Sequence, residues 1–514
     1  MGRSGFVLNV DDRTPPLIVP SGDGFLLERL PLGSKVIYPA ESLDVVPDLS
    51  AAIGAALDAP LDSAPLDALL QPGMKLTIAF DDITVPTPTM RRPDVRGTII
   101  EAVLTRAARA GVDDVELICG NGLNRRLTAA ELTHLLGERV FRSFYADNRL
   151  NNHDAEDQNS LRAIGSTAAG EVAVNARVTD SDLVVYVHLV VTPRSGGGES
   201  FARALGSAGT VGQISGFRAS AGDAEDPDAV SALVTAALPI FQIDTTLDNH
   251  VFPAALDLLG KREWEWRLKD QARFLAFRRG LAATPAKLRH RMLNAAEAGY
   301  RPTSITAGAP VAVQAASRRQ ILSQQMVEVA GQADVGVIGI PERNPYSVDS
   351  VTNPVLSAWL GLGAFFGAHT GRPFVREGGA LVLYSPMSAQ FSPLHHPSYV
   401  DFFADVLSST RDAAQIAADF ETKFTTDPWY AHLYRTSFAF HGVHPCYLWY
   451  QVAESTRHLS DVVWVGADRG SVDRLGFRAA STLADALEIV ASSVGRTPAI
   501  SYLHVPPQIV VDIR

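Results

Sequence analysis

The sequence is poor in cysteine and lacks a concentrated basic segment. Only two of its 514 residues are cysteines, Cys119 and Cys446, which excludes a multi-disulfide framework and a cysteine-rich zinc or iron–sulfur site. Lys and Arg number 45 against 56 Asp and Glu, so the formal net charge is −11. Because phosphate recognition needs a concentrated basic surface, this balance argues against nucleic acid as a partner.

Long apolar runs are also missing. We find no run of about 18 apolar residues, so no transmembrane helix and no membrane partner are expected. Residues 1–10 do not combine a charged segment with a long apolar stretch, which argues against a signal peptide. With 46% apolar and 20% charged residues, the composition is typical of a globular protein of the cytoplasm.

Strand-like and helix-like segments alternate along the chain. Residues 95–110 place apolar side chains at helical spacing and are followed by Gly111, a common residue after a helix end. Thr128 and Glu131 have the spacing of a capping box. Strands are predicted at 76–80, 115–119, 172–175, 183–187, 335–340, 380–384 and 462–465, and further helices at 43–57, 317–330 and 483–492. The alternation predicts an α/β fold with largely parallel sheets.

The length of the chain exceeds that of one ordinary hydrophobic core. We predict an N-terminal α/β domain over residues 1–255 and a C-terminal α/β domain over residues 304–514. A charged helical segment, residues 256–303, connects them and is either a surface element or a lid. The cleft between the two domains is the expected ligand site.

The most informative segment, residues 80–89, reads F-D-D-I-T-V-P-T-P-T and follows a strand-like run. Ligands of open α/β sheets bind outside the carboxyl ends of the strands, so Asp81, Asp82 and Thr84 are candidate binding residues. The two carboxylates could orient a ribose or a substrate hydroxyl. The alternative is that one of them caps neighbouring loop amides.

Two more loops carry polar groups that could bind an anion. Asn124 and Arg125 lie in a strand-to-helix loop. An arginine in such a loop either binds a carboxylate or phosphate through two parallel hydrogen bonds or forms surface salt bridges. The second loop contains Ser195, Gly196, Gly197 and Gly198, which either cradle a phosphate or carboxylate or form a flexible turn.

Several single residues are candidates for acid/base chemistry. Glu199 either complements a helix dipole or acts as a base. His188 ends an apolar strand and His153 has an acidic neighbour; each is a packed residue or an acid/base group. The pairs His395–His396 and His441–His444 are read as loop or partly buried histidines, because two histidines without a third ligand give only a weak metal signal. No metal ligand is predicted.

In order and spacing, these motifs resemble the lactate racemase (LarA-like) family. The matching segments are D-D-I-T at 81–84, the loop at 120–128, N-H-D at 152–154, I-G-S-T at 164–167 and S-G-G-G-E at 195–199. The resemblance implies the fold, a racemase or epimerase acting on a 2-hydroxy acid, and a nickel-pincer nucleotide as cofactor. In such a reaction a hydride acceptor and acid/base groups on both faces of the substrate carbon are needed.

When the family's functional positions are matched to this sequence, most of them hold a residue of a different type. Val85 stands at the arginine that binds the substrate carboxylate, Glu199 at the lysine that tethers the cofactor, and Asn124 at the first catalytic histidine. Arg194 is closest to the second histidine, and no histidine stands at the position of the nickel ligand. Arg343 and Tyr346 correspond to the region where the second domain contacts substrate, and Arg343 could supply the missing cation.

Two hypotheses follow from the sequence. The first is a diverged isomerase of this family, acting on a 2-hydroxy acid or related polar metabolite in the interdomain cleft. The second is the same fold with changed chemistry, either a lyase or hydrolase that needs no nickel pincer or a non-catalytic metabolite- or nucleotide-binding protein. The cofactor and the oligomeric state remain open at this stage.

Overall fold

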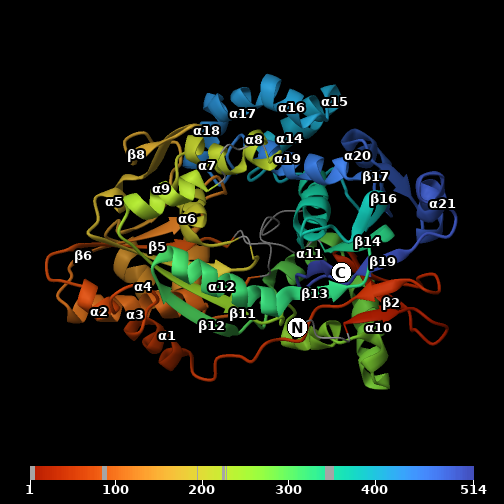
Figure 1. Ribbon diagram of the computed structural model, residues 1–514, viewed down its shortest axis with the longest axis horizontal. Helices are drawn as coiled ribbons and strands as arrows, with labels where there is room; N and C mark the ends of the chain where they lie inside the picture. The colour runs from red at the N-terminus through yellow and green to blue at the C-terminus, as the bar shows by residue number, and fades with distance from the viewer. Residues whose placement is uncertain (1–5, 84–88, 194, 223–225, 227, 342–351) are drawn as a thin grey trace.

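The computed structural model describes residues 6–83, 89–193, 195–222, 226, 228–341 and 352–514. Four predicted site residues, Thr84, Arg194, Arg343 and Tyr346, lie outside these ranges. Two large sheets dominate the described residues, one in each half of the view in Figure 1. None of the helices in these ranges is both long enough and apolar enough to span a bilayer.

The first sheet has six strands in the order β12-β11-β10-β5-β6-β7. All neighbours pair in parallel except β12 with β11. The strands are β5 (Lys75–Asp81), β6 (Asp114–Gly120), β7 (Leu150–Asn152), β10 (Leu183–Val190), β11 (Ile240–Leu247) and β12 (Pro302–Gly308). This arrangement confirms the predicted α/β class and brings the carboxyl ends of β5, β10 and β11 to one edge.

Helices cover both faces of this sheet. The helices α1 (Leu49–Asp58), α3 (Val95–Arg109) and α4 (Ala129–Tyr145) share a hydrophobic core with one face. On the other face, α6 (Gly197–Leu205) and α9 (Ala229–Ala237) pack over β10, and α12 (Pro310–Gln325) packs over β11. The capping box predicted at Thr128 and Glu131 is present at the start of α4.

The second sheet has nine strands, with the main order β1-β4-β19-β14-β16-β17-β18 and the hairpin β2–β3 attached through β14. Its pairs are parallel except β1 with β4 and β2 with β3. The strands are β1 (Val7–Asn9), β2 (Leu17–Gly22), β3 (Gly24–Glu28), β4 (Lys35–Ile37), β14 (Ala333–Pro341), β16 (Val375–Tyr384), β17 (Leu459–Val465), β18 (Arg478–Ala480) and β19 (Ile500–Leu503).

Strand pairing crosses the domain boundaries predicted from the sequence. Residues 7–37 supply four strands to the second sheet, although they belong to the predicted N-terminal domain. In turn β12 and α12, which follow residue 301, pack with the first sheet. Both departures come from long-range strand pairing, for which the local sequence holds no signal.

Two predicted elements also need correction. The helix predicted at 317–330 ends at Gln325, because Met326–Val329 forms β13 and pairs with β20 (Val510–Ile513). The strand predicted at 172–175 exists as β9 (Gly170–Asn175), but it pairs with β8 (Leu161–Thr167) in a separate antiparallel hairpin. Alternating apolar residues signal a strand without revealing which sheet it joins.

Candidate active site

A buried carboxylate–imidazole pair lies at the carboxyl edge of the first sheet. Asp81 ends β5, and its Oδ2 lies 2.6 Å from His188 Nδ1 on β10. The same oxygen accepts from the Leu189 amide at 2.8 Å, and Oδ1 accepts from the Tyr186 hydroxyl at 2.7 Å. Three donors converge on Asp81, so it accepts the Nδ1 proton of His188 and fixes the orientation of the ring.

This pair is charged at neutral pH. Burial alone would lower the pKa of His188, but the adjacent Asp81 carboxylate outweighs it and raises the pKa to about 9. Burial likewise opposes ionisation of Asp81, yet His188 and the hydrogen bonds leave its pKa below the usual 3.8. His188 therefore carries a second proton, on Nε2, and this buried atom has no hydrogen-bond partner within the described ranges.

The pair predicts a defined pH dependence of folding stability. Folding raises the pKa of His188 from 6.5 to about 9. The charged His188 therefore contributes fully to the free energy of unfolding below pH 6.5, and this contribution is lost as the pH rises through 9. At acid pH, the contribution of the Asp81 carboxylate to the free energy of unfolding is lost as the pH falls below 3.8. We expect the difference in free energy of unfolding between wild type and His188→Gln to shrink by on the order of 3 kcal/mol from about pH 6 to about pH 10. Urea unfolding at both pH values measures it, and an unchanged difference would contradict the ion pair.

Asp244 lies beside His188 on the neighbouring strand. The two residues are register partners of the parallel pair β10–β11, so their side chains share a face of the sheet. Asp244 Oδ1 accepts from Gln242 Nε2 at 2.6 Å, whereas Oδ2 is buried without a hydrogen-bond partner in the described chain. Burial raises the pKa of Asp244, which favours its neutral, proton-donating form.

The covering helix α12 adds further polar groups. Gln242 Oε1 is buried and, like His188 Nε2, lacks a hydrogen-bond partner in the described ranges, and the buried Ser317 hydroxyl lies close enough to Asp244 to lower its pKa. One turn before Ser317, Gln314 Nε2 donates to the carbonyl of Gly196 at 3.2 Å. Buried polar atoms rarely remain unsatisfied, so this concentration indicates a site for waters or a polar ligand.

The glycine loop predicted to bind an anion lies against this polar cluster. Gly196 and Gly197 adopt φ angles of +118° and +62°, which disfavour other residues. A Cβ on Gly196 would lie 3.7 Å from Asp244 Oδ2, and one on Gly197 would lie 2.4 Å from Gln314 Oε1. The glycines thus bring the start of α6 directly over Asp244 and Gln314.

The third glycine serves helix packing. A Cβ on Gly198 would lie 2.4 Å from the backbone oxygen of Ser231 in α9. We therefore expect Gly198→Ala to destabilise the fold by about 1–3 kcal/mol in urea unfolding. The matched control is Gly54→Ala in α1, where nothing lies within 4 Å and a gain of about 0.5–1 kcal/mol is expected. Equal effects of the two substitutions would refute the packing role.

Asp82, next to Asp81, is connected to the second domain. Its Oδ2 accepts from Asn124 Nδ2 at 3.2 Å, and Asn124 Oδ1 lies 3.1 Å from His444 Nε2. His444 begins α19 (His444–Arg457), and its Nδ1 lies 2.6 Å from the hydroxyl of Tyr399 in α14 (Pro397–Asp401). We call these four residues, Asp82, Asn124, His444 and Tyr399, the interdomain hydrogen-bond chain.

The direction of this chain follows from its donors. Since the Asn124 amide donates to Asp82, its oxygen must accept from His444 Nε2–H, and His444 Nδ1 must accept from Tyr399. Burial, with His441 nearby, lowers the pKa of His444 to about 3, so the ring is neutral. His444 therefore differs from His188 in charge and has both ring nitrogens engaged.

Other predicted site residues have structural partners. Arg125 is buried and donates to both carboxylate oxygens of Glu131. Glu199 is about 39% exposed and pairs with Arg203 one turn along α6, at 2.7 Å. His153 is buried between the Gly206 carbonyl and Asn175, and burial lowers its pKa to about 4. None of these contacts involves the Asp81–His188 pair.

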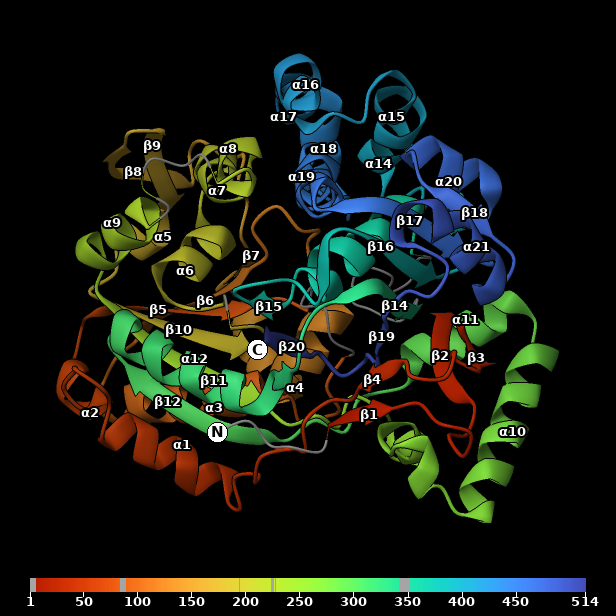
Figure 2. The same cartoon turned by 45° about the vertical axis from the view of Figure 1, so that its right-hand side comes forward.

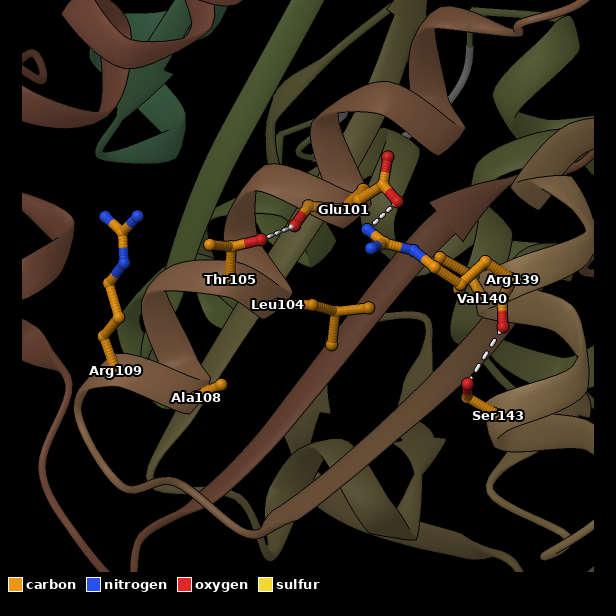
Figure 3. Close-up of a pocket in the computed structure, with 8 residues that line it drawn as sticks. All are labelled: Glu101, Leu104, Thr105, Ala108, Arg109, Arg139, Val140 and Ser143. Carbon is orange, nitrogen blue, oxygen red and sulfur yellow. Dashed lines mark hydrogen bonds and ion pairs between the residues drawn. The ribbon is translucent and has the colours of Figure 1, made fainter.

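A surface groove of about 580 Å³ lies on the opposite face of the sheet, between α3 and α4. Figure 3 shows its lining residues, which include an ion pair between Glu101 and Arg139. It is open to solvent and shares no residue with the polar cluster, so we do not assign it to the candidate active site.

Comparison with known proteins finds a family model that matches part of the chain and a solved structure with the same fold. The model of the lactate racemase N-terminal domain matches residues 28–212, and this is the family that the sequence motifs resemble. The whole chain has the fold of the lactate racemase apoprotein from Thermoanaerobacterium thermosaccharolyticum, with a TM-score of 0.63, 15% identity and coverage of 96% of this chain and 99% of that chain.

A second structure, of a protein from Thermotoga maritima, matches with a TM-score of 0.48 and 12% identity over 87% of this chain and 96% of its own. No curated protein sequence matches the chain.

The side chains do not fit the nickel-pincer nucleotide implied by the resemblance. Glu199, at the tethering position, is a carboxylate paired with Arg203, and Asn124, at the histidine position, is held between Asp82 and His444. No group of three or more His, Cys, Asp or Glu in the described chain is arranged to hold a metal ion. We therefore derive no chemical step through this cofactor.

Several site residues were missed by the sequence reasoning. Gln242 and Asp244 alternate within an apolar strand, and this polar pair could have marked the site-facing side of β11. Gln314 and Ser317 lie one turn apart on α12, but nothing local distinguishes them from surface residues. The sequence does not distinguish His444 from a loop histidine, because its partner Asn124 is 320 residues away.

Proposed function

We propose that the chain is a racemase- or epimerase-type isomerase acting on a 2-hydroxy acid or a related polar, acidic metabolite. The main support is the buried Asp81–His188 ion pair, whose Nε2–H has no protein acceptor in the described ranges and lies at the carboxyl edge of a parallel sheet. The family of residues 28–212 and the fold of the chain are consistent with this reaction class.

In this proposal His188 takes two roles. Its cationic Nε2–H binds the substrate carboxylate or stabilises negative charge that develops on the substrate. It thereby supplies the positive charge that Val85, at the family's arginine position, does not. His188 can also give its Nε2 proton to an oxygen of the substrate and take the same proton back, while Asp81 holds the orientation of the ring. Asp244, the register partner of His188 on β11, adds a further buried polar group beside it.

The test is conversion of one enantiomer into the other. Single enantiomers of a panel of 2-hydroxy acids would be incubated with the full-length protein purified from its own host and analysed by chiral chromatography. We expect formation of the opposite enantiomer or epimer from at least one acid. Binding of an acid without conversion, or conversion to a different compound, would reject the isomerase assignment.

A second function has a specific observation in its favour. The poor fit of Glu199 and Asn124 to the nickel-pincer nucleotide favours chemistry that needs no hydride acceptor, such as elimination or hydrolysis, or ligand binding alone. The same incubations separate these outcomes. A lyase or hydrolase yields a dehydrated or cleaved product, which mass spectrometry identifies, whereas a binding protein returns the acid unchanged.

A further inference from the structure

The helical segment between the two halves of the chain presents an apolar face to solvent. We call α10 (Leu268–Ala283) and α11 (Ala286–Ala295) the helical arm. Figure 2 shows α10 at the periphery of the molecule, beside the β2–β3 hairpin. One face of α10 packs there through Phe274, whose ring centroid lies 6.4 Å from that of Phe25.

The remaining surface of α10 carries a second, exposed seam. Residues at spacings of four and three lie on one helix face, the pattern of a helix that packs against another chain. Leu268 is 84% and Leu275 40% exposed, and the other residues of this seam, Ala272, Arg279 and Ala282, are exposed as well. The seam is therefore available to a partner.

The shorter helix α11 has even less support. Leu288 and Met292, four residues apart on one face, are 51% and 54% exposed, and none of the α11 residues with a described side chain is buried. Helices of about 10 residues are marginal in water unless an apolar face is packed. A partner that covers Leu288 and Met292 would supply this packing.

Charge points to the identity of the partner. Residues 268–295 contain seven Lys or Arg and one Asp, which gives 7 − 1 = +6. The whole chain carries −11, so the rest of it carries −11 − 6 = −17. The rest of the chain is thus opposite in net charge to the arm, while Leu288 and Met292 remain exposed in the single chain.

We propose that the helical arm docks onto the acidic surface of a second copy of this chain, forming a homodimer. A two-fold arrangement lets each arm cover the same surface of its partner and closes the assembly. The apolar residues of the arm would lie at the centre of each contact, and the basic residues would surround them.

The experiment is sedimentation velocity of the full-length protein at micromolar concentrations, in low and high salt. Wild type is expected to be a dimer that weakens with salt, because opposite charges are screened. Leu275→Glu with Leu288→Glu should weaken dimerisation by about tenfold or more per substitution. The control is Trp429→Glu, which changes an apolar side chain that is 60% exposed in the second domain and should leave the dimer intact.

A second double variant distinguishes loss of the dimer contact from loss of the fold. Arg279→Glu with Arg291→Glu reverses charges without touching the exposed leucines and should also give a monomer, with an unchanged circular dichroism spectrum. A monomeric wild type would overturn the proposal, as would a dimer that survives both double substitutions. Monomeric protein that binds phosphatidylcholine–phosphatidylglycerol vesicles through the arm would likewise overturn it and assign the arm to a lipid surface.

Discussion

Replacement of His188 by glutamine is expected to lower kcat/KM by about 10²- to 10⁴-fold, the range for loss of a positioned acid/base group. Glutamine keeps much of the volume of the ring but cannot carry the Nε2 proton as a cation. Asp81→Asn should have an effect in the same direction, because an amide cannot hold the imidazolium in its charged form. The measurement is steady-state kinetics on the acid identified by chiral chromatography.

The matched control is His153→Gln, which alters another fully buried histidine. Both ring nitrogens of His153 contact structural partners, and its pKa of about 4 keeps it neutral. This substitution should lower the melting temperature and leave the activity of the folded fraction close to wild type. If His153→Gln and His188→Gln reduced kcat/KM equally, His188 would be one more packed histidine.

His444→Ala is expected to lower kcat by about 10- to 100-fold with little change in KM, because it removes the support that orients Asn124 and, through it, Asp82, the chain neighbour of Asp81. His444 is a positioning residue in this account, since both of its nitrogens contact other side chains. His444→Gln, whose amide can still donate to Asn124, should restore part of the loss.

The control for this prediction is His441→Asn, which breaks another contact between the domains. His441 Nε2 lies 2.8 Å from Glu156 Oε1, and this contact does not involve Asn124 or Asp82. If both substitutions lowered kcat alike, and His444→Gln gave no recovery, His444 would contribute only to domain docking. Thermal unfolding of each variant shows whether a loss of folded protein explains the change.

The elements of the first sheet could be predicted from the sequence because their signals are local. The strand at β5, the capped helix at α4 and the glycine loop before α6 each depend on neighbouring residues, and each is present. The place of residues 7–37 in the second sheet could not be predicted, because they pair with strands hundreds of residues later. Hydrophobic periodicity indicates the type of an element and does not fix its partner.

The residues of the candidate site also divide into those that local sequence signals predict and those that only long-range packing brings together. Asp81, Asp82 and His188 could be predicted, because they stand at the ends of recognisable strands. Asp244, Ser317 and His444 join them only through the packing of β11, α12 and α19, which the sequence does not reveal. The sequence around Arg125 suggests an anion ligand and does not reveal that Glu131, six residues later, pairs with it.

The measurement that tests the central claim most directly is a crystal structure of the protein with the acid that it converts. The account predicts a substrate carboxylate oxygen within about 2.7–2.9 Å of His188 Nε2, the distance of a charge-assisted hydrogen bond. It also predicts contact with the polar cluster around Asp244. A substrate bound in the groove between α3 and α4, or anywhere that leaves His188 Nε2 without contact, would contradict the account.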